Sequence, residues 1–502
     1  MTTRAASATP AAPDFPQWFG HPRPLWMLFM TEFWERFAFY SVSWALALYV
    51  VAQFFHGDPA GQGWAGGIFG AYTALIYATG IFGGYAADRL VGYQRAILLG
   101  AVVMAAGLFV IAMPQRGVFL LGLALVIVGD GLFKPNISSM VGQLYGPDDP
   151  RRDRGFTLFY MGINAGALVA PLLTGWLAAR FTAMPLQQNY RLVFIAAGVG
   201  MLLSLLWFAI GRRGLGVVGR PPAGGRGGLR FAQVLLGTML CVLLAWWLLA
   251  RVGPQGLQWL LGALFVAVAA LLLREALREG RVPLDRVLAM LLIFAFNIVF
   301  WMFYYQLGSS FEFLAENWVD RTMFGGWVFP TGWFQAVSPL AILVLAPLLT
   351  LIWAWLGRRG REPSIPRKFG LGLIFNALGM LVLAYALGRL LDARGLIPFW
   401  PLTACYALQT LGELCLSPIG LSMVTKLAPA RSTGFAMGGW FLSVAVGGNL
   451  SGLVASRISG AHGMTAASAQ SGFMFGFWLL AGAGVLLLLI ATRLNRLMHG
   501  VR

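Results

Sequence analysis

One feature recurs along nearly the whole chain: windows of about 20 mostly apolar residues, the length that an α-helix needs to cross a bilayer. Only 11% of the 502 residues are charged, against about 25% in an ordinary soluble domain, so a soluble surface is excluded. The sequence predicts an all-α integral membrane protein with fourteen spans, which begin near Pro24, Trp64, Tyr93, Val118, Gly155 and Arg191, cover 231–250 and 256–273, and begin again near Asp285, Thr331, Lys368, Leu396, Thr433 and Gly472.

Basic residues are distributed unevenly between alternate loops. If the amino terminus is cytoplasmic, 26 of the 36 Lys and Arg fall in cytoplasmic loops and tails, 8 in external loops and 2 inside spans. Because positive charge accumulates on the cytoplasmic side of membrane proteins, we expect both termini to be cytoplasmic. The net charge of +18 then reflects topology beside anionic lipid rather than binding to nucleic acid.

The order of the spans predicts two six-helix bundles separated by an inserted helix pair. Six plus six helices is the layout of transporters that alternate access to a site at the bilayer midplane. The inserted pair has no buried charge and is interpreted as a lateral packing element. We expect a disordered cytoplasmic tail at 1–24, the N-terminal bundle at 25–211, a Gly- and Arg-rich cytoplasmic linker at 212–230, the inserted pair at 231–274 and the C-terminal bundle at 285–496.

Three charged side chains lie within the first span, where burying a charge is costly. Glu32, Glu35 and Arg36 are spaced i, i+3 and i+4, so they share one helical face. Two carboxylates and one guanidinium leave an excess negative charge, which Lys134 in the fourth span is placed to balance. A carboxylate in such a cluster can take up a proton when its partners rearrange slightly. The cluster therefore predicts proton coupling, with a static ion-pair knot between helices as the alternative.

Glu413 is the single charge between Arg394 and Lys426. A cationic pair on one half, Arg36 and Lys134, and a lone anion on the other suit a zwitterionic substrate held at both ends by charge-assisted hydrogen bonds. Polar and aromatic side chains in the spans are candidates for pocket walls or, taken singly, for helix packing: Tyr40, Tyr72, Tyr77, Asn164, Trp301, Gln306, Trp440 and Asn449.

A short charged motif follows the second span, with the pattern Gly84-x-x-x-Asp88-x-x-x-Gly92-x-x-Arg95. It lies at a cytoplasmic helix turn. We expect Asp88, Arg89 and Arg95 to dock neighbouring helices and to gate the inward opening. The motif is interpreted as a structural latch.

Longer signatures resemble those of the proton-dependent oligopeptide transporters of the major facilitator superfamily. The resemblance covers Trp26 to about Arg496 and implies the major facilitator fold, with the inserted pair added. The signatures are Glu32-x-x-Glu35-Arg36-Phe37, Gly129-Asp130-Gly131-Leu132-Phe133-Lys134-Pro135-Asn136, Phe159-Tyr160-Met161-Gly162-Ile163-Asn164 and Gly412-Glu413-Leu414-Cys415-Leu416-Ser417-Pro418, the last similar to the family's tenth helix.

The resemblance implies an importer of di- and tripeptides, driven by the proton gradient and functional as a monomer in the bacterial cytoplasmic membrane. The family's proton-coupling role passes to Glu32, Glu35 and Arg36. Contact with the peptide carboxylate passes to Arg36 and Lys134, and contact with the peptide amino group passes to Glu413.

The chain departs from the family at an external gate. Many bacterial members have a seventh-helix Glu where this chain has Tyr305, and its partner Arg is here Ser43. Both partners are absent together, so Glu312 or Glu316 is predicted to gate instead, unless these are solvated loop residues. The eighth-helix Asn of the family's peptide site is here Ser338.

Other functions remain as alternatives. Another small solute, such as an amino acid, fits the same fold, whereas the retained carboxylates disfavour anions. A passive channel or a peptide receptor would keep the charges as structure. No metal site, catalytic set or cofactor other than the coupling proton is expected, because all four histidines, His21, His56, His462 and His499, fall in loops or tails.

Overall fold

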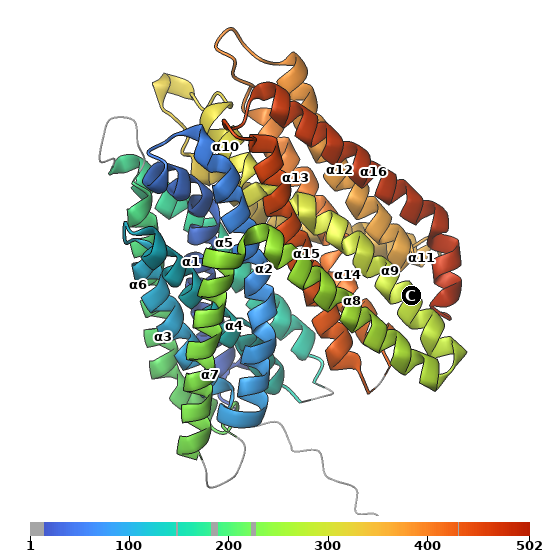
Figure 1. The fold of residues 1–502 in the computed structure, drawn as a ribbon. Helices are drawn as coiled ribbons and strands as arrows, with labels where there is room; N and C mark the ends of the chain where they lie inside the picture. The colour runs from blue at the N-terminus through green and yellow to red at the C-terminus, as the bar shows by residue number, and fades with distance from the viewer. Residues whose placement is uncertain (1–14, 147–148, 182–188, 222–226, 430, 502) are drawn as a thin grey trace, which may run out of the picture.

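A bundle of long helices forms the protein (Figure 1). The computed structural model describes residues 15–146, 149–181, 189–221, 227–429 and 431–501. Before the first helix, β1 (Gln17–Trp18) pairs antiparallel with β2 (His21–Pro22). The expected disorder is therefore wrong for residues 15–22, where Phe15 is buried. Residues 23 and 24 of the expected tail begin the first helix, and residues 1–14 lie outside the described residues.

Six long helices make the N-terminal half, in which α1 packs on α5 and α6 while α4 packs on α2 and α3. Pro24 lies in the first turn of α1, where its missing N–H is no loss. Gly92 (φ 79°) ends the π-helical extension of α2. The elements are α1 (Arg23–Phe54), η1 (Pro59–Gly61), α2 (Gln62–Ala86), η2 (Ala87–Val91), α3 (Tyr93–Ile111), α4 (Arg116–Gln143), α5 (Arg152–Arg180), α6 (Tyr190–Gly211) and η3 (Arg212–Leu215).

The inserted pair consists of α7 (Gly227–Trp247) and α8 (Gly253–Glu279), joined by η4 (Leu248–Val252). The 53-residue segment Gly227–Glu279 is one of thirteen described segments apolar and long enough to span a membrane. A straight helix of that length would measure about 80 Å, and Gly253 (φ 69°) divides it into two. The pair runs along one side of the bundle (Figure 1), with α7 on α4 and α8 on α9 and α15. The predicted fold class is confirmed.

The C-terminal half differs from the prediction at two spans. The span that begins near Asp285 ends in a 3-10 turn and a short separate helix. The span that begins near Leu396 breaks after Leu414, and a new helix with Pro418 in its first turn follows. The elements are α9 (Arg281–Tyr304), η5 (Tyr305–Gly308), α10 (Ser310–Asn317), η6 (Phe324–Gly326), η7 (Thr331–Ala336), α11 (Val337–Arg358), α12 (Ile365–Arg389), α13 (Trp400–Leu414), α14 (Ser417–Leu427), α15 (Thr433–Ser459) and α16 (Ala466–Leu497).

The halves meet along α2 with α15 and along α5 with η7 and α11. Their closest packing is at the end that carries α10 (Figure 1), where a Cβ on Gly452 would lie 2.6 Å from the carbonyl oxygen of Gly66. Gln62 Oε1 accepts from the Met464 N–H at 2.8 Å, and Trp333 Nε1 donates to the Leu172 carbonyl at 2.9 Å. This is the end that the charge distribution predicts to be external.

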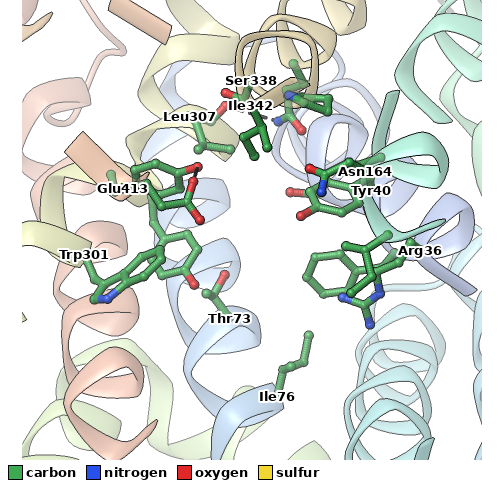
Figure 2. A pocket seen from close by; sticks show the side chains of 18 of the residues that line it. Arg36, Tyr40, Thr73, Ile76, Asn164, Trp301, Leu307, Ser338, Ile342 and Glu413 are labelled. Carbon is green, nitrogen blue, oxygen red and sulfur yellow. Dashed lines mark hydrogen bonds between the residues drawn. The ribbon is translucent and has the colours of Figure 1, made fainter. Parts of the chain in front are cut away.

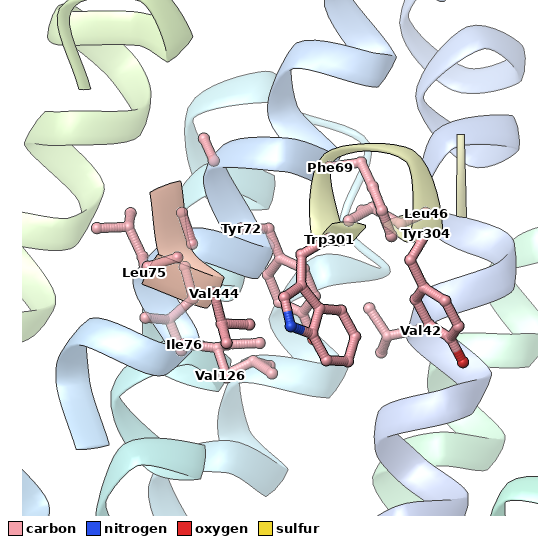
Figure 3. Packing of buried hydrophobic residues seen from close by; sticks show 14 of the residues in the cluster. Val42, Leu46, Phe69, Tyr72, Leu75, Ile76, Val126, Trp301, Tyr304 and Val444 are labelled. Atoms are coloured by element: carbon pink, nitrogen blue, oxygen red, sulfur yellow. The ribbon is translucent and has the colours of Figure 1, made fainter. Parts of the chain in front are cut away.

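We call these contacts between the halves at the α10 end the seal. Buried apolar side chains from both halves form a layer next to it. In Figure 3, Phe69 and Tyr72 from α2 lie beside Trp301 from α9 and Val444 from α15. Phe69 fits against Gly308, where any Cβ would clash with its ring. The seal and this layer close one end of the space between the halves.

Candidate functional site

Arg36 is the centre of a buried ion cluster between α1 and α4. Its guanidinium binds Glu35 through two hydrogen bonds of 2.5 and 2.7 Å, Nε lies 3.3 Å from Glu32 Oε1, and Nη2 lies 3.0 Å from Asp130 Oδ1. All four side chains are at most 3% exposed. The predicted grouping of Glu32, Glu35 and Arg36 on one helical face is therefore present in the structure.

Asp130 is a third carboxylate that we did not predict as a site residue, although it stands in the Gly129–Lys134 motif as a charge inside a span. Three carboxylates now face one guanidinium, and Glu32 Oε2 has no hydrogen-bond partner among the described residues. A set with more acid than base can exchange a proton without breaking apart.

Lys134 lies one helical turn beyond Asp130 and is half-buried. Its ammonium is 5.2 Å from the ring of Tyr77 and 5.8 Å from that of Phe39, and it makes no ion pair within the described residues. The structure thus shows no direct contact between Lys134 and the cluster among the described residues, and its charge-balancing role stays a prediction.

A pocket between the halves joins the two charged regions. Figure 2 shows Arg36, Tyr40 and Asn164 on one side and Glu413 and Trp301 on the other. The lining comes from both halves: Arg36, Phe39, Tyr40, Ser43, Phe69, Tyr72, Thr73, Ile76, Tyr77, Lys134, Tyr160, Ile163, Asn164, Ala167, Trp301, Tyr304, Tyr305, Leu307, Gln335, Ser338, Pro339, Ile342, Tyr406 and Glu413.

Glu413 is the anionic group of the pocket. It lies at the end of α13, just before the helix break, and Tyr304 Oη donates to its Oε2 at 2.6 Å. No Lys, Arg or His of the described residues forms an ion pair with it. Among the described residues, the polar contact of this carboxylate is therefore the hydrogen bond from Tyr304.

The positions of the missing gate pair are occupied by neutral side chains. Tyr305 forms a hydrogen bond of 2.8 Å with Tyr77 of the other half, and its ring stacks on Trp301 at 5.1 Å. Ser43 and Ser338 line the same pocket. The structure thus places a phenol–phenol contact between halves at the family's carboxylate position.

The two predicted gating carboxylates differ in environment. Glu312 is completely buried, and its Oε1 accepts from Gln335 Nε2 at 2.9 Å. Glu316 pairs with Arg321 at 3.2 Å and accepts from Thr331. The alternative that these are merely solvated loop residues is therefore wrong.

The latch motif is exposed, and its predicted docking is absent from this conformation. Asp88 accepts from Tyr93 Oη on the neighbouring helix turn, and Asp88, Arg89 and Arg95 form no ion pairs in the part of the chain that the structure describes. In this conformation the hydrogen bonds between the halves lie at the α10 end and around the pocket. The described hydrogen bonds therefore do not join the halves at the latch motif.

Trp440 was predicted as a pocket wall and does not line the pocket. Its ring packs against Phe294 and Phe369, with centroids 5.7 and 6.1 Å apart. Gln306 and Asn449 also serve helix packing, through bonds to Ser451 and to Gln258 respectively. Tyr72 does line the pocket and its hydroxyl has no partner among the described residues. The sequence analysis did not predict the lining residues Tyr160 and Tyr304, although Tyr160 stands in the Phe159–Asn164 signature.

Comparison with known proteins agrees with this geometry. The family model for the POT family matches residues 94–470. The chain is 36% identical over 447 residues to the dipeptide and tripeptide permease B of Yersinia enterocolitica, covering 88% of each chain.

Two solved structures share the fold over nearly their whole length. One is the peptide transporter POT in complex with sulfate, with a TM-score of 0.83, 33% identity and coverage of 97% of this chain and 98% of that one. The other is a POT family transporter in complex with a thioalcohol conjugated peptide, with a TM-score of 0.80, 29% identity and coverage of 96% and 99%. The chain, with its buried Arg36 cluster and opposed Lys134 and Glu413, belongs to the POT family of transporters.

Proposed function

We propose that the chain is a proton-coupled symporter that imports di- and tripeptides by alternating access. The observation that carries the proposal is the pair of opposite charges across one pocket: Arg36 and Lys134 on the N-terminal half, and Glu413 on the C-terminal half. A peptide backbone is a zwitterion whose ends carry complementary charges, and charge-assisted hydrogen bonds hold such ends well.

The substrate roles follow from this arrangement. Lys134 and Arg36 bind the peptide carboxylate, and Glu413 binds the amino group in place of its bond from Tyr304. Tyr40, Tyr72, Asn164 and Trp301 form the walls. We propose that one copy of the chain suffices for transport, because both halves of the pocket belong to one continuous polypeptide.

The coupling role belongs to Glu32, Glu35 and Arg36, joined by Asp130. Peptide carboxylate binding competes for the guanidinium that now holds Glu35 at 2.5 Å. A carboxylate that loses its cation in a dry site takes up a proton. Proton and peptide binding are thereby linked, with the proton as the only coupling ion proposed.

The proposed location is the bacterial cytoplasmic membrane, with both termini inside, as the distribution of basic residues indicates. In that orientation the seal at the α10 end faces outward. Asp88, Arg89 and Arg95 then form their latch when the cytoplasmic end closes.

The test is uptake of labelled dialanine into proteoliposomes, with and without an inward proton gradient. Accumulation above the external concentration that a protonophore abolishes is the expected result. Equilibration indifferent to the gradient would overturn coupling, and uptake of amino acids but not peptides would favour the other small-solute function.

A further inference from the structure

Glu312 is a buried acid with no function in the peptide site. Its side chain is completely inaccessible, Oε1 accepts a single hydrogen bond from Gln335, and Oε2 has no partner within the described residues. It makes no ion pair there either. The nearby cation Arg321 is engaged by Glu316 at 3.2 Å and by Thr331 Oγ1 at 2.7 Å.

The surroundings offer no compensation for a negative charge. Besides Glu316 and Arg321, the titratable groups that interact with Glu312 are Tyr190 of α6 and Tyr406 of α13, both neutral phenols. The elements α1, α15 and η5 pack against α10 without placing a described charge within ion-pair distance, and η7 supplies only the amide of Gln335. An unpaired buried hydroxyl costs far less than an unpaired buried charge.

Glu312 lies next to the seal, so the free-energy cost of burying its charge depends on whether the seal is closed. The helix α10 packs on α1 of the other half. The same region holds the contact of Gly332 with Trp44 and that of Gly308 with Phe69. Parting these surfaces admits water to α10, where a carboxylate is well solvated.

We propose that Glu312 is a second proton-binding site of the transport cycle, which carries a proton while the external gate is closed and returns it to external water when the gate opens. Its own side chain does not line the peptide pocket, from which Gln335 separates it. The site makes gate closure depend on external acidity. The inference rests on the proposed alternating access. It assigns to Glu312 a pH dependence of gate closure that Tyr305 cannot provide, because the phenol of Tyr305 is neutral.

The test measures the gate directly, through labelling of a cysteine at Ser43 by a membrane-impermeant maleimide in right-side-out vesicles. Ser43 lines the pocket behind the seal. Cys241 is replaced by Ala, whereas Cys405 and Cys415 are buried. Because thiol reactivity itself rises with pH, each rate is divided by that of F324C, whose side chain is fully exposed at 101%.

In the reference protein, we expect normalised labelling to increase roughly threefold or more from mildly acid to mildly alkaline external pH. Glu312→Gln keeps the acceptor for Gln335 but cannot ionise, so labelling stays low and flat. Glu312→Asp keeps a titrating group on a shorter side chain, so it retains a pH response, with a midpoint that differs from that of the reference. The matched control is Asp58→Asn, an exposed carboxylate at the same end that accepts from the Ala60 N–H, and it leaves the response unchanged.

An unchanged pH response in Glu312→Gln, or an equal loss in Asp58→Asn, overturns the proposal. A variant that does not fold is recognised by the absence of a single gel-filtration peak, and Glu312→Asp then decides: a pH response altered relative to the reference supports the site, and an identical one overturns it. Dialanine uptake is measured in parallel. Failed uptake with intact pH-dependent labelling would overturn the proposed function but not this gate.

Discussion

Among single residues, Arg36 carries the most interactions of the site, because one guanidinium holds Glu32, Glu35 and Asp130 together. Spacing along α1 predicted the first two partners. Asp130 comes from α4, 94 residues away, and no local spacing brings it there. Any one carboxylate of the cluster is held less tightly than in an isolated pair, which is the condition for proton exchange.

Glu35→Gln is expected to lower proton-driven dialanine accumulation about tenfold or more, while peptide counterflow survives. The amide preserves the shape of the side chain but cannot carry a proton. Both activities are measured in the same proteoliposomes. Loss of counterflow to the same extent would contradict a coupling role.

Lys134→Ala is expected to weaken binding of free dialanine about tenfold, and binding of carboxyl-amidated dialanine much less, because one charge-assisted hydrogen bond is lost. Competition against a labelled peptide measures both affinities. If the two peptides lose affinity equally, Lys134 does not bind the carboxylate.

At the scale of elements, short segments at helix ends decide how the halves touch. The turn η5 presents Tyr305 to Tyr77 of α2, and the break between α13 and α14 follows directly after Glu413. The hydropathy windows located these helices but not their ends, since both interruptions lie within apolar sequence.

Tyr305→Phe removes the neutral hydrogen bond between the halves, which is worth about 1 kcal/mol, or roughly fivefold in the ratio of closed to open gates. External labelling of S43C should rise accordingly. Tyr77→Phe should have the same effect, and the double variant should add nothing further. Additive effects would show that the two phenols act separately.

The β1–β2 hairpin is attached to the α4–α5 loop by a bond of 2.8 Å between His21 Nδ1 and Tyr145 Oη. Burial, together with Arg151, lowers the pKa of His21. The docked hairpin therefore favours neutral histidine, and its stability is lost as the pH falls below about 6.5. The hydrogen-exchange protection of residues 17–21, measured against the intrinsic exchange rate at each pH, should fall on acidification, and His21→Asn should abolish that fall.

At the scale of the whole molecule, two halves enclose the pocket, and glycine permits their closest approach. Gly66 and Gly70 of α2 meet Gly452 of α15 with backbone against backbone. The conformation described here is sealed at this end.

Gly452→Val is expected to prevent that seal and to lower dialanine uptake about tenfold or more, because added methyl groups cannot fit beside the Gly66 carbonyl. External S43C labelling should rise in the same variant. The control Gly482→Ala has no atom within 4 Å of its added Cβ and should transport normally. Normal uptake by Gly452→Val would show that transport does not need this close approach.

The sequence by itself determined the spans, the six-plus-six order, the charged triad of α1 and the family, because hydropathy, charge and motif spacing are local properties of a chain that a bilayer constrains strongly. Only the tertiary structure decided which helix faces meet. It brought Asp130 to Arg36 and Tyr77 to Tyr305 and turned Trp440 into the core. It also left Glu312 buried without an ion pair to any described residue. Such contacts depend on the rotation and tilt of each helix against its neighbours, which spacing within a single helix does not specify.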